Sequence, residues 1–313
     1  MIKKILRWSI LGGTLCFVAK TLIDNWGKVS DRIEQINSAE WSILAIATGV
    51  TLLAHILAGW VWTWILRDLN QKIRTSDFIQ IYLQTNIAKY IPGNIWHYYG
   101  RIRAAKDARI STSTATLSVL LEPSLMAAAA LIVVLLGSQL TATNIPIILR
   151  IGQILGLVIV LIIIHPWFLN PVVGYLQRLK IKKNRYTSNL SSSITSVRRY
   201  PSIPLLGEIG FILLRSAGFI LTIYALAPLN ISQIPSLIGA FSFAWLIGLV
   251  VPGAPGGLGV FEAIAIFTLK NSLFTASLPD DLIITTTLIY RLISILSEST
   301  GAALSWLDAK LFK

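Results

Sequence analysis

The chain has 313 residues, of which 54% are hydrophobic and 13% are charged, and its mean hydropathy is +0.69. Soluble domains carry about 25% charged residues, so this composition excludes a water-soluble globule and indicates one integral membrane domain over residues 1–313. The formal net charge of +13 falls in short loops between apolar segments, which membrane topology explains better than binding to nucleic acid. Cys16 is the only cysteine, which excludes an intramolecular disulfide and a cysteine metal cluster.

Six apolar segments are long enough to cross a hydrocarbon layer of about 30 Å. These expected spans cover residues 5–24, 41–66, 113–137, 145–164, 203–227 and 282–307. The first resembles a signal peptide but lacks a small-residue cleavage site, so we expect it to remain as a span. Two further apolar stretches, 78–98 and 236–269, contain Pro92-Gly93 and Pro252-Gly253 near their centres. A Pro-Gly pair breaks a helix, so neither stretch is expected to be one continuous helix.

The distribution of Lys and Arg predicts the orientation of these segments. Basic residues gather at both termini, at 67–74, at 101–109 and in the loop 165–202, and the positive-inside rule assigns all of these to the cytoplasm. Both ends of 78–98 then lie inside, and both ends of 236–269 lie outside. The predicted fold is therefore an all-α transmembrane helical bundle with two re-entrant hairpins of opposite orientation, a pattern typical of inverted-repeat transporters.

The two breaks supply most of the candidate binding residues. Irregular backbone at membrane depth must be buried in protein or line a wet cavity, and a helix beginning near Leu258 would direct its N–H groups towards a phosphate or carboxylate. In the other break, Asn94 is expected to cap a second half-helix, and Trp96 belongs to an aromatic cluster suited to an acyl chain. The candidate substrate-binding residues are Pro92, Gly93, Asn94, Trp96, Arg101, Pro252, Gly253, Gly256, Gly257, Gly259, Glu262 and Arg291. The alternative is that both breaks are structural kinks in long helices.

Other charged residues fall within apolar spans, where charges face partners or water. The candidates for coupling or for ion pairs are Glu122, Glu208, Arg215 and Glu298. Seven residues separate Glu208 from Arg215, and likewise Arg291 from Glu298, so each pair lies on one helix face. These charges either line a central cavity or tie spans together, and the sequence leaves both possibilities open.

Residue patterns for catalysis or cofactor binding are missing from the sequence. The three histidines have no acids at ligand spacing, so we expect no metal, and His55 is interpreted as a satisfied polar group. No P-loop, nucleophile elbow or paired-cysteine motif is present. We therefore expect that the protein is not an enzyme and that it binds no cofactor.

Three motifs resemble the lysylphosphatidylglycerol synthase transmembrane, flippase-like family. They are Lys89-Tyr-Ile-Pro-Gly-Asn-Ile-Trp-His97 with Gly100-Arg101, Pro252-Gly-Ala-Pro-Gly-Gly-Leu-Gly-Val-Phe-Glu262, and Tyr290-Arg291. The resemblance covers nearly the whole chain but only the membrane domain of that family, without the aminoacyl-transferase domain, so synthase activity is not implied.

The resemblance implies a flippase or translocator in a bacterial cell (inner or plasma) membrane, with both termini cytoplasmic. Its partner would be a membrane lipid, either an anionic phospholipid or a lipid-linked sugar, held between the two hairpins. Some family members are thought to act with glycosyltransferases. The alternative function is accordingly a non-catalytic partner or regulator of such an enzyme, acting through the basic loop Arg178 to Arg199.

Overall fold

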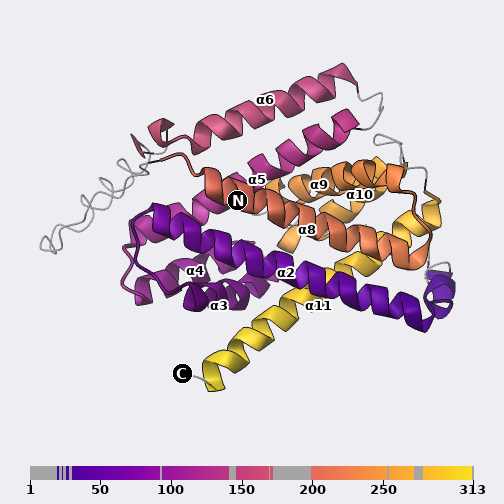
Figure 1. Cartoon of the computed structure of the whole chain (residues 1–313), viewed down its shortest axis with the longest axis horizontal. Coiled ribbons are helices and arrows are strands. Elements are labelled where there is room, and N and C mark those ends of the chain that lie inside the picture. The colour runs from indigo at the N-terminus through magenta and orange to yellow at the C-terminus, as the bar shows by residue number, and fades with distance from the viewer. Residues whose placement is uncertain are drawn as a thin grey trace, which may run out of the picture.

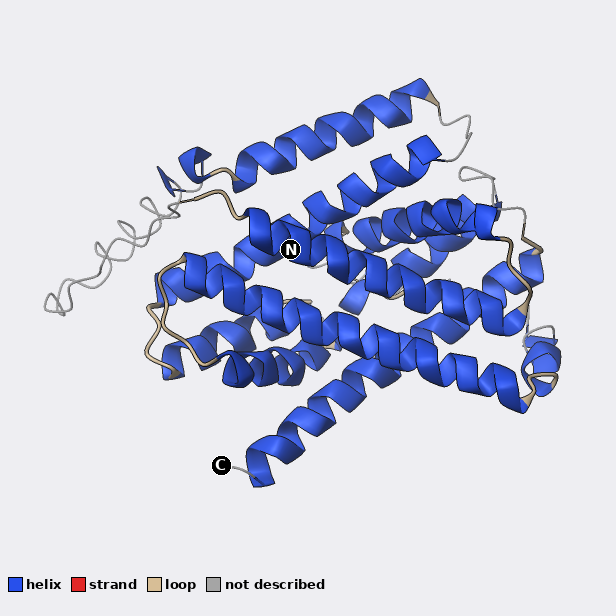
Figure 2. Ribbon diagram, in the orientation of Figure 1, coloured by secondary structure: helices blue, strands red, loops and turns tan. Residues whose placement is uncertain are grey.

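The computed structural model describes residues 20, 23, 26–27, 30–91, 94–140, 146–168, 170–171, 199–251, 254–270 and 278–311. Within these residues every regular element is a helix (Figure 2). The all-α prediction is thereby confirmed. The expected first span 5–24, apart from residues 20 and 23, and most of the basic loop 165–202 lie outside the described residues.

The helices fall into a long and a short group. The longer ones are α2 (Ser38–Asp68), α5 (Thr112–Leu140), α6 (Ile147–Ile164), α8 (Ser202–Leu226), α9 (Ile234–Val250) and α11 (Asp280–Leu311). The shorter ones are α3 (Thr75–Asn86), α4 (Trp96–Asp107), α10 (Val260–Lys270) and the 3-10 turns η1 (Ile87–Tyr90), η2 (Ile231–Gln233) and η3 (Pro255–Gly257).

Five helical stretches are long and apolar enough to cross a membrane. Four of them are α2, α5 to Gly137, α8 and α11, which match the predicted spans 41–66, 113–137, 203–227 and 282–307. The fifth runs from Ile231 to Val250 and belongs to the stretch that the sequence assigns to a re-entrant hairpin. The re-entrant orientation and the number of crossings therefore stay predictions.

The outer faces of α6 and α11 are apolar, as expected for contact with lipid. On α6 the side chains of Ile151, Leu155 and Ile159 are exposed, and on α11 Leu292 and Leu296 are exposed. Large apolar surfaces of this kind are not left open to water in soluble monomers. The exposed faces therefore agree with the composition in placing the bundle in a hydrocarbon environment.

Close packing between α2 and α8 forms the centre of the bundle, and α11 crosses both of them (Figure 1). Two glycines of α8 allow this approach. A Cβ at Gly207 would overlap Val61, and a Cβ at Gly218 would overlap the hydroxyl of Thr51. Small residues at helix contacts are the usual way for membrane helices to approach closely.

Both apolar stretches with a Pro-Gly pair are broken between helices. The first ends α3 at Asn86, continues as η1 to Tyr90 and resumes as α4 at Trp96. The second ends α9 at Val250, passes through η3 and resumes as α10 at Val260. We call these the first and second broken segments. Pro92, Gly93, Pro252 and Gly253 themselves lie outside the described residues.

The two broken segments contact each other through their 3-10 turns. Within each segment the helices pack together, α3 on α4 and α9 on α10, and η1 touches η3. Residues about 165 positions apart in the sequence therefore meet inside the bundle, beside α11.

Candidate functional site

A cavity of about 110 Å³ lies where the broken segments meet the long helices. Its wall comes from both broken segments and from α2, α5, α8 and α11. The charged residues that line it are Lys89, Arg101, Glu122, Arg215, Arg291 and Glu298. Charged groups in the interior of a membrane bundle are costly to bury and mark functional positions.

Glycines of η3 shape one side of the cavity. Gly256 has a φ of 57°, and a Cβ there would lie 2.8 Å from Cε1 of Tyr90. Gly257 has a φ of 71°, and a Cβ there would lie 3.2 Å from the carbonyl oxygen of Gly248. Gly259 has a φ of 79°. Side chains disfavour this left-handed region, so all three positions favour glycine for backbone geometry, and Gly256 and Gly257 also for space.

Arg291 of α11 holds the second broken segment in place. Its Nε donates to Oε1 of Glu262. Its Nη1 donates to the carbonyl oxygen of Gly256 and its Nη2 to that of Gly257, each at 3.2 Å. Oε2 of Glu262 accepts from the backbone N–H of Gly259 at 2.6 Å. The carboxylate of Glu262 thus occupies the N-terminal end of α10, which the sequence analysis left open for an external anion.

Arg101 of α4 and Glu122 of α5 form an ion pair that also lines the cavity. Nη1 of Arg101 donates to Oε2 of Glu122 at 2.5 Å, and both side chains are 2% exposed. The guanidinium lies over the ring of Tyr82, 3.7 Å from its centroid. Nε of Arg101 is buried and has no acceptor among the described residues.

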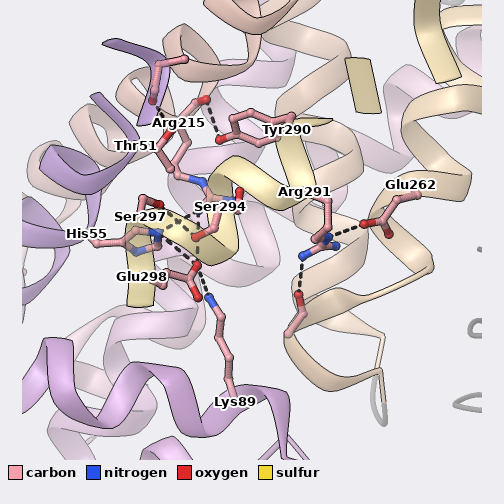
Figure 3. Close-up of polar contacts among 12 residues, drawn as sticks. Thr51, His55, Lys89, Arg215, Glu262, Tyr290, Arg291, Ser294, Ser297 and Glu298 are labelled. Carbon is pink, nitrogen blue, oxygen red and sulfur yellow. Dashed lines mark hydrogen bonds and ion pairs between the residues drawn. The ribbon is translucent and has the colours of Figure 1, made fainter. Parts of the chain in front are cut away.

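A third charged group centres on Glu298 of α11 (Figure 3). Its Oε1 lies 2.7 Å from Nζ of Lys89, 3.1 Å from Nε2 of His55 and 3.6 Å from Nη1 of Arg215. Oε2 of Glu298 and Nε of Arg215 are buried without a hydrogen-bond partner in the described part of the chain. Two cations therefore share one carboxylate, unlike the one-to-one pairs of Arg101 and Arg291.

His55 completes this network. Nη1 of Arg215 lies 2.9 Å from Nε2 of the ring, and a guanidinium can only donate. Nε2 also lies 3.1 Å from Oε1 of Glu298, which can only accept, so the tautomer decides which of the two contacts is a hydrogen bond. The interpretation of His55 as a satisfied polar group agrees with this geometry, although the sequence analysis did not place it at the cavity.

The structure brings some of the predicted residues to the cavity and leaves others away from it. Asn94, Arg101, Gly256, Gly257 and Arg291 line it, as do Glu122, Arg215 and Glu298. Gly259 and Glu262 lie directly behind its wall through their contacts with Arg291 and with each other.

Two predictions about individual residues need correction. The N-cap of α4 is Ile95, so Asn94 is not the cap and instead takes a left-handed conformation with a φ of 51°. Glu208 does not line the cavity, and both its carboxyl oxygens are buried without a partner among the described residues. The side chain of Trp96 is 46% exposed outside the cavity, so its contact with an acyl chain stays a prediction.

Lys89 is the functional candidate that the sequence analysis missed. It stands in η1, and its side chain reaches Glu298 in the interior. The signal in the sequence is a lysine within an apolar stretch, three positions before a Pro-Gly pair.

Together these features define an integral membrane protein whose interior holds a charged cavity between two broken helical segments. The family model for the lysylphosphatidylglycerol synthase TM region matches residues 10–297, and the chain belongs to this family. The resemblance inferred from the three motifs is thereby confirmed, for the membrane region alone. No curated protein sequence matches the chain significantly.

Proposed function

We propose that the protein binds the anionic headgroup of a membrane lipid, or of a lipid-linked substrate, between its two broken segments and moves it between leaflets. One observation carries this proposal: among the described residues, the cavity is lined by four cations, Lys89, Arg101, Arg215 and Arg291, and by only two carboxylates. Membership of a membrane-region family related to lipid handling supports the choice of lipid as the ligand.

The hydrogen-bonding state of the wall supports an anionic ligand. Nε of Arg101 and Nε of Arg215 are buried donors without acceptors in the described part of the chain. A buried donor left without a partner costs about 1–3 kcal/mol. A phosphate oxygen within the cavity would satisfy such a donor, so binding would recover part of this cost.

The contact between the broken segments suggests how a headgroup would move. Tyr90 lies against Gly256 where η1 meets η3, and Lys89 links the first broken segment to α11. Separation of η1 from η3 would open the cavity, while the acyl chains remain in the hydrocarbon beside the apolar outer faces. The cavity thereby offers the headgroup a polar route with little exposure to hydrocarbon.

The proposal is tested in liposomes of phosphatidylethanolamine and phosphatidylglycerol that contain the purified protein and a trace of fluorescent phosphatidylglycerol. Dithionite destroys the probe in the outer leaflet, and continued loss of fluorescence reports movement from the inner one. We expect the wild type to move the probe and Gly256→Leu to move it at least about tenfold more slowly, which corresponds to roughly 1.4 kcal/mol in the barrier.

Gly152→Leu is the matched control, because Gly152 is in a helix and a Cβ there meets nothing within 4 Å. This variant should retain the wild-type rate. Equal rates in empty liposomes and in liposomes with wild-type protein would contradict the proposal for this probe. A slow Gly152→Leu variant would show that the Gly256→Leu result does not report on the cavity.

We also propose a bacterial cell membrane as the location, cytoplasmic termini and a non-catalytic role. The alternative role as partner of a glycosyltransferase rests on the loop Arg178 to Arg199, which lies outside the described residues except at its last position. No described feature favours it over translocation.

A further inference from the structure

The charges around the cavity leave a surplus of one positive charge. Arg101 is matched by Glu122, and Arg291 is matched by Glu262. Within the described part of the chain, Lys89 and Arg215 have only Glu298 as an anionic partner. A charge far from water needs a partner, so this group has room for one more negative charge.

The other titratable groups nearby contribute no charge to this balance. The ring of His55 is buried beside the guanidinium of Arg215, where a charged imidazolium would be costly. Nδ1 of His97 is buried without a partner in the described residues, where a charged ring would be costly. Glu208 is fully buried, and no donor among the described residues reaches either of its oxygens. An ionised carboxylate there would be strongly unfavourable, so Glu208 is counted as a neutral acid.

We propose that the cavity selects a headgroup with a single negative charge, a phosphodiester, over phosphomonoesters and diphosphates, and that Lys89 and Arg215 hold it. This inference rests on the proposed binding of lipid and adds the charge class of the ligand. A phosphodiester balances the surplus and leaves the cavity neutral. A doubly charged phosphomonoester would leave one uncompensated negative charge in the interior.

The position follows from the geometry of the Glu298 group. Nε of Arg215 is a buried donor that lacks an acceptor within the described residues, and Lys89 Nζ approaches the same carboxylate from the opposite segment. The two unesterified oxygens of a phosphodiester can accept from these two cations together. Glu298 pairs with the same two cations as the ligand. Its carboxylate neutralises one of their two positive charges, so one positive charge is left for the ligand to balance.

The test is a lipid competition measured by native mass spectrometry on the full chain in neutral detergent. The probes are dioleoyl phosphatidylglycerol, phosphatidic acid and phosphatidylethanolamine in equal amounts at a pH of about 8, where a phosphomonoester, whose second ionisation falls near pH 6, carries two charges. The wild type should bind phosphatidylglycerol about tenfold or more in preference to phosphatidic acid, and should bind the zwitterionic phosphatidylethanolamine less than phosphatidylglycerol.

Changes at Lys89 and Glu298 shift the surplus in known steps. Lys89→Gln removes it, so phosphatidylglycerol binding should fall about tenfold or more. Glu298→Gln raises it to two, so the preference should turn to phosphatidic acid. The double variant, with both Lys89→Gln and Glu298→Gln, has a surplus of one again, so its preference for phosphatidylglycerol should be restored. Such restoration is not expected from two independent losses of structure.

Lys106→Gln is the matched control, because Lys106 is exposed on α4 and outside the cavity. It removes one positive charge and should leave all three bound lipids in wild-type proportion. Lys89→Gln leaves Glu298 paired with Arg215 and is expected to fold. Lys89→Arg keeps the charge and should retain the wild-type preference, which separates charge from packing.

Equal binding of phosphatidic acid and phosphatidylglycerol by the wild type would overturn the inference. A double variant that fails to regain the preference for phosphatidylglycerol would also overturn it. The fate of the proposed function is read separately, from the liposome assay. Selective binding without movement between leaflets would support this inference and contradict the proposed translocation. Movement without selective binding would support translocation and contradict this inference.

Discussion

Lys89 donates a hydrogen bond of 2.7 Å to Glu298 across 209 positions of sequence. This contact joins a 3-10 turn of the first broken segment to α11, the helix whose Arg291 also holds the second broken segment. α11 therefore carries the polar contacts to both broken segments. Loss of any one of these contacts should affect the cavity while leaving the rest of the bundle packed.

The η1–η3 contact should depend on the absence of a side chain at Gly256. For Gly256→Ala we expect a loss of about 1–3 kcal/mol in stability, because the residue would keep a left-handed backbone and approach Tyr90. Thermal unfolding of the purified protein in detergent measures this. Adding Tyr90→Ala should recover the steric part but not the backbone part. Gly152→Ala, in an open helical position, should be neutral or slightly stabilising, and a loss there equal to that of Gly256→Ala would contradict the argument.

Removal of the Arg291 guanidinium should strongly reduce the stability of the protein. Arg291→Gln would leave Glu262 buried without its cation and would remove the donors to Gly256 and Gly257, at a cost of about 3–5 kcal/mol. Glu262→Gln should cost less, since an amide oxygen still accepts from the N–H of Gly259. The measurement is again thermal unfolding, with Arg103→Gln at an exposed position as the control. Equal effects of Arg291→Gln and Arg103→Gln would be the contrary result.

Arg101 should not be replaceable by lysine. Its planar guanidinium lies 3.7 Å from the centroid of Tyr82 while it pairs with Glu122, and an ammonium group cannot provide the same stacked contact. We expect Arg101→Lys to cost about 1–2 kcal/mol. In a double-mutant cycle with Tyr82→Leu, the coupling should account for most of that loss. Strict additivity of the two substitutions would show that the stacking contributes nothing.

The predicted orientation can be measured by labelling single cysteines in a Cys16→Ser background. Ser76, Ser232 and Asp280 are exposed and lie at the start of α3, at the start of the second broken segment and at the start of α11. In whole cells, an impermeant maleimide should label Ser232→Cys and Asp280→Cys but not Ser76→Cys. Labelling of Ser232→Cys and Asp280→Cys from opposite sides would show that the second broken segment crosses the membrane.

The sequence predicted four of the spanning helices well, because long apolar runs report directly on burial in hydrocarbon. The expected spans 41–66 and 203–227 differ from α2 and α8 by only a few residues at each end. The breaks at the two Pro-Gly pairs were also predictable, since proline removes a helical hydrogen bond and glycine weakens the helix further, whereas Pro123 alone stands inside the unbroken α5.

The pairing of the charges could not be predicted in the same way. Helix periodicity placed Arg291 and Glu298 on one face but gave no information about partners from other helices, and the two residues belong to separate groups. The expectation for the N-terminus of α10 ignored the residue that occupies it, Glu262. That residue stands three positions after Gly259, a spacing at which a carboxylate reaches back to cap its own helix.

Burial of the Glu298 group has a consequence for behaviour in solution. The side chain of Glu298 is 1% exposed and that of Lys89 is 18% exposed, so dissolved ions reach these contacts poorly. Counterions weaken exposed pairs over a Debye length of about 10 Å at 0.1 M salt but affect buried pairs far less. Headgroup recognition in the cavity should therefore persist at high ionic strength, whereas attraction of anionic lipid to a basic surface loop would disappear under the same conditions.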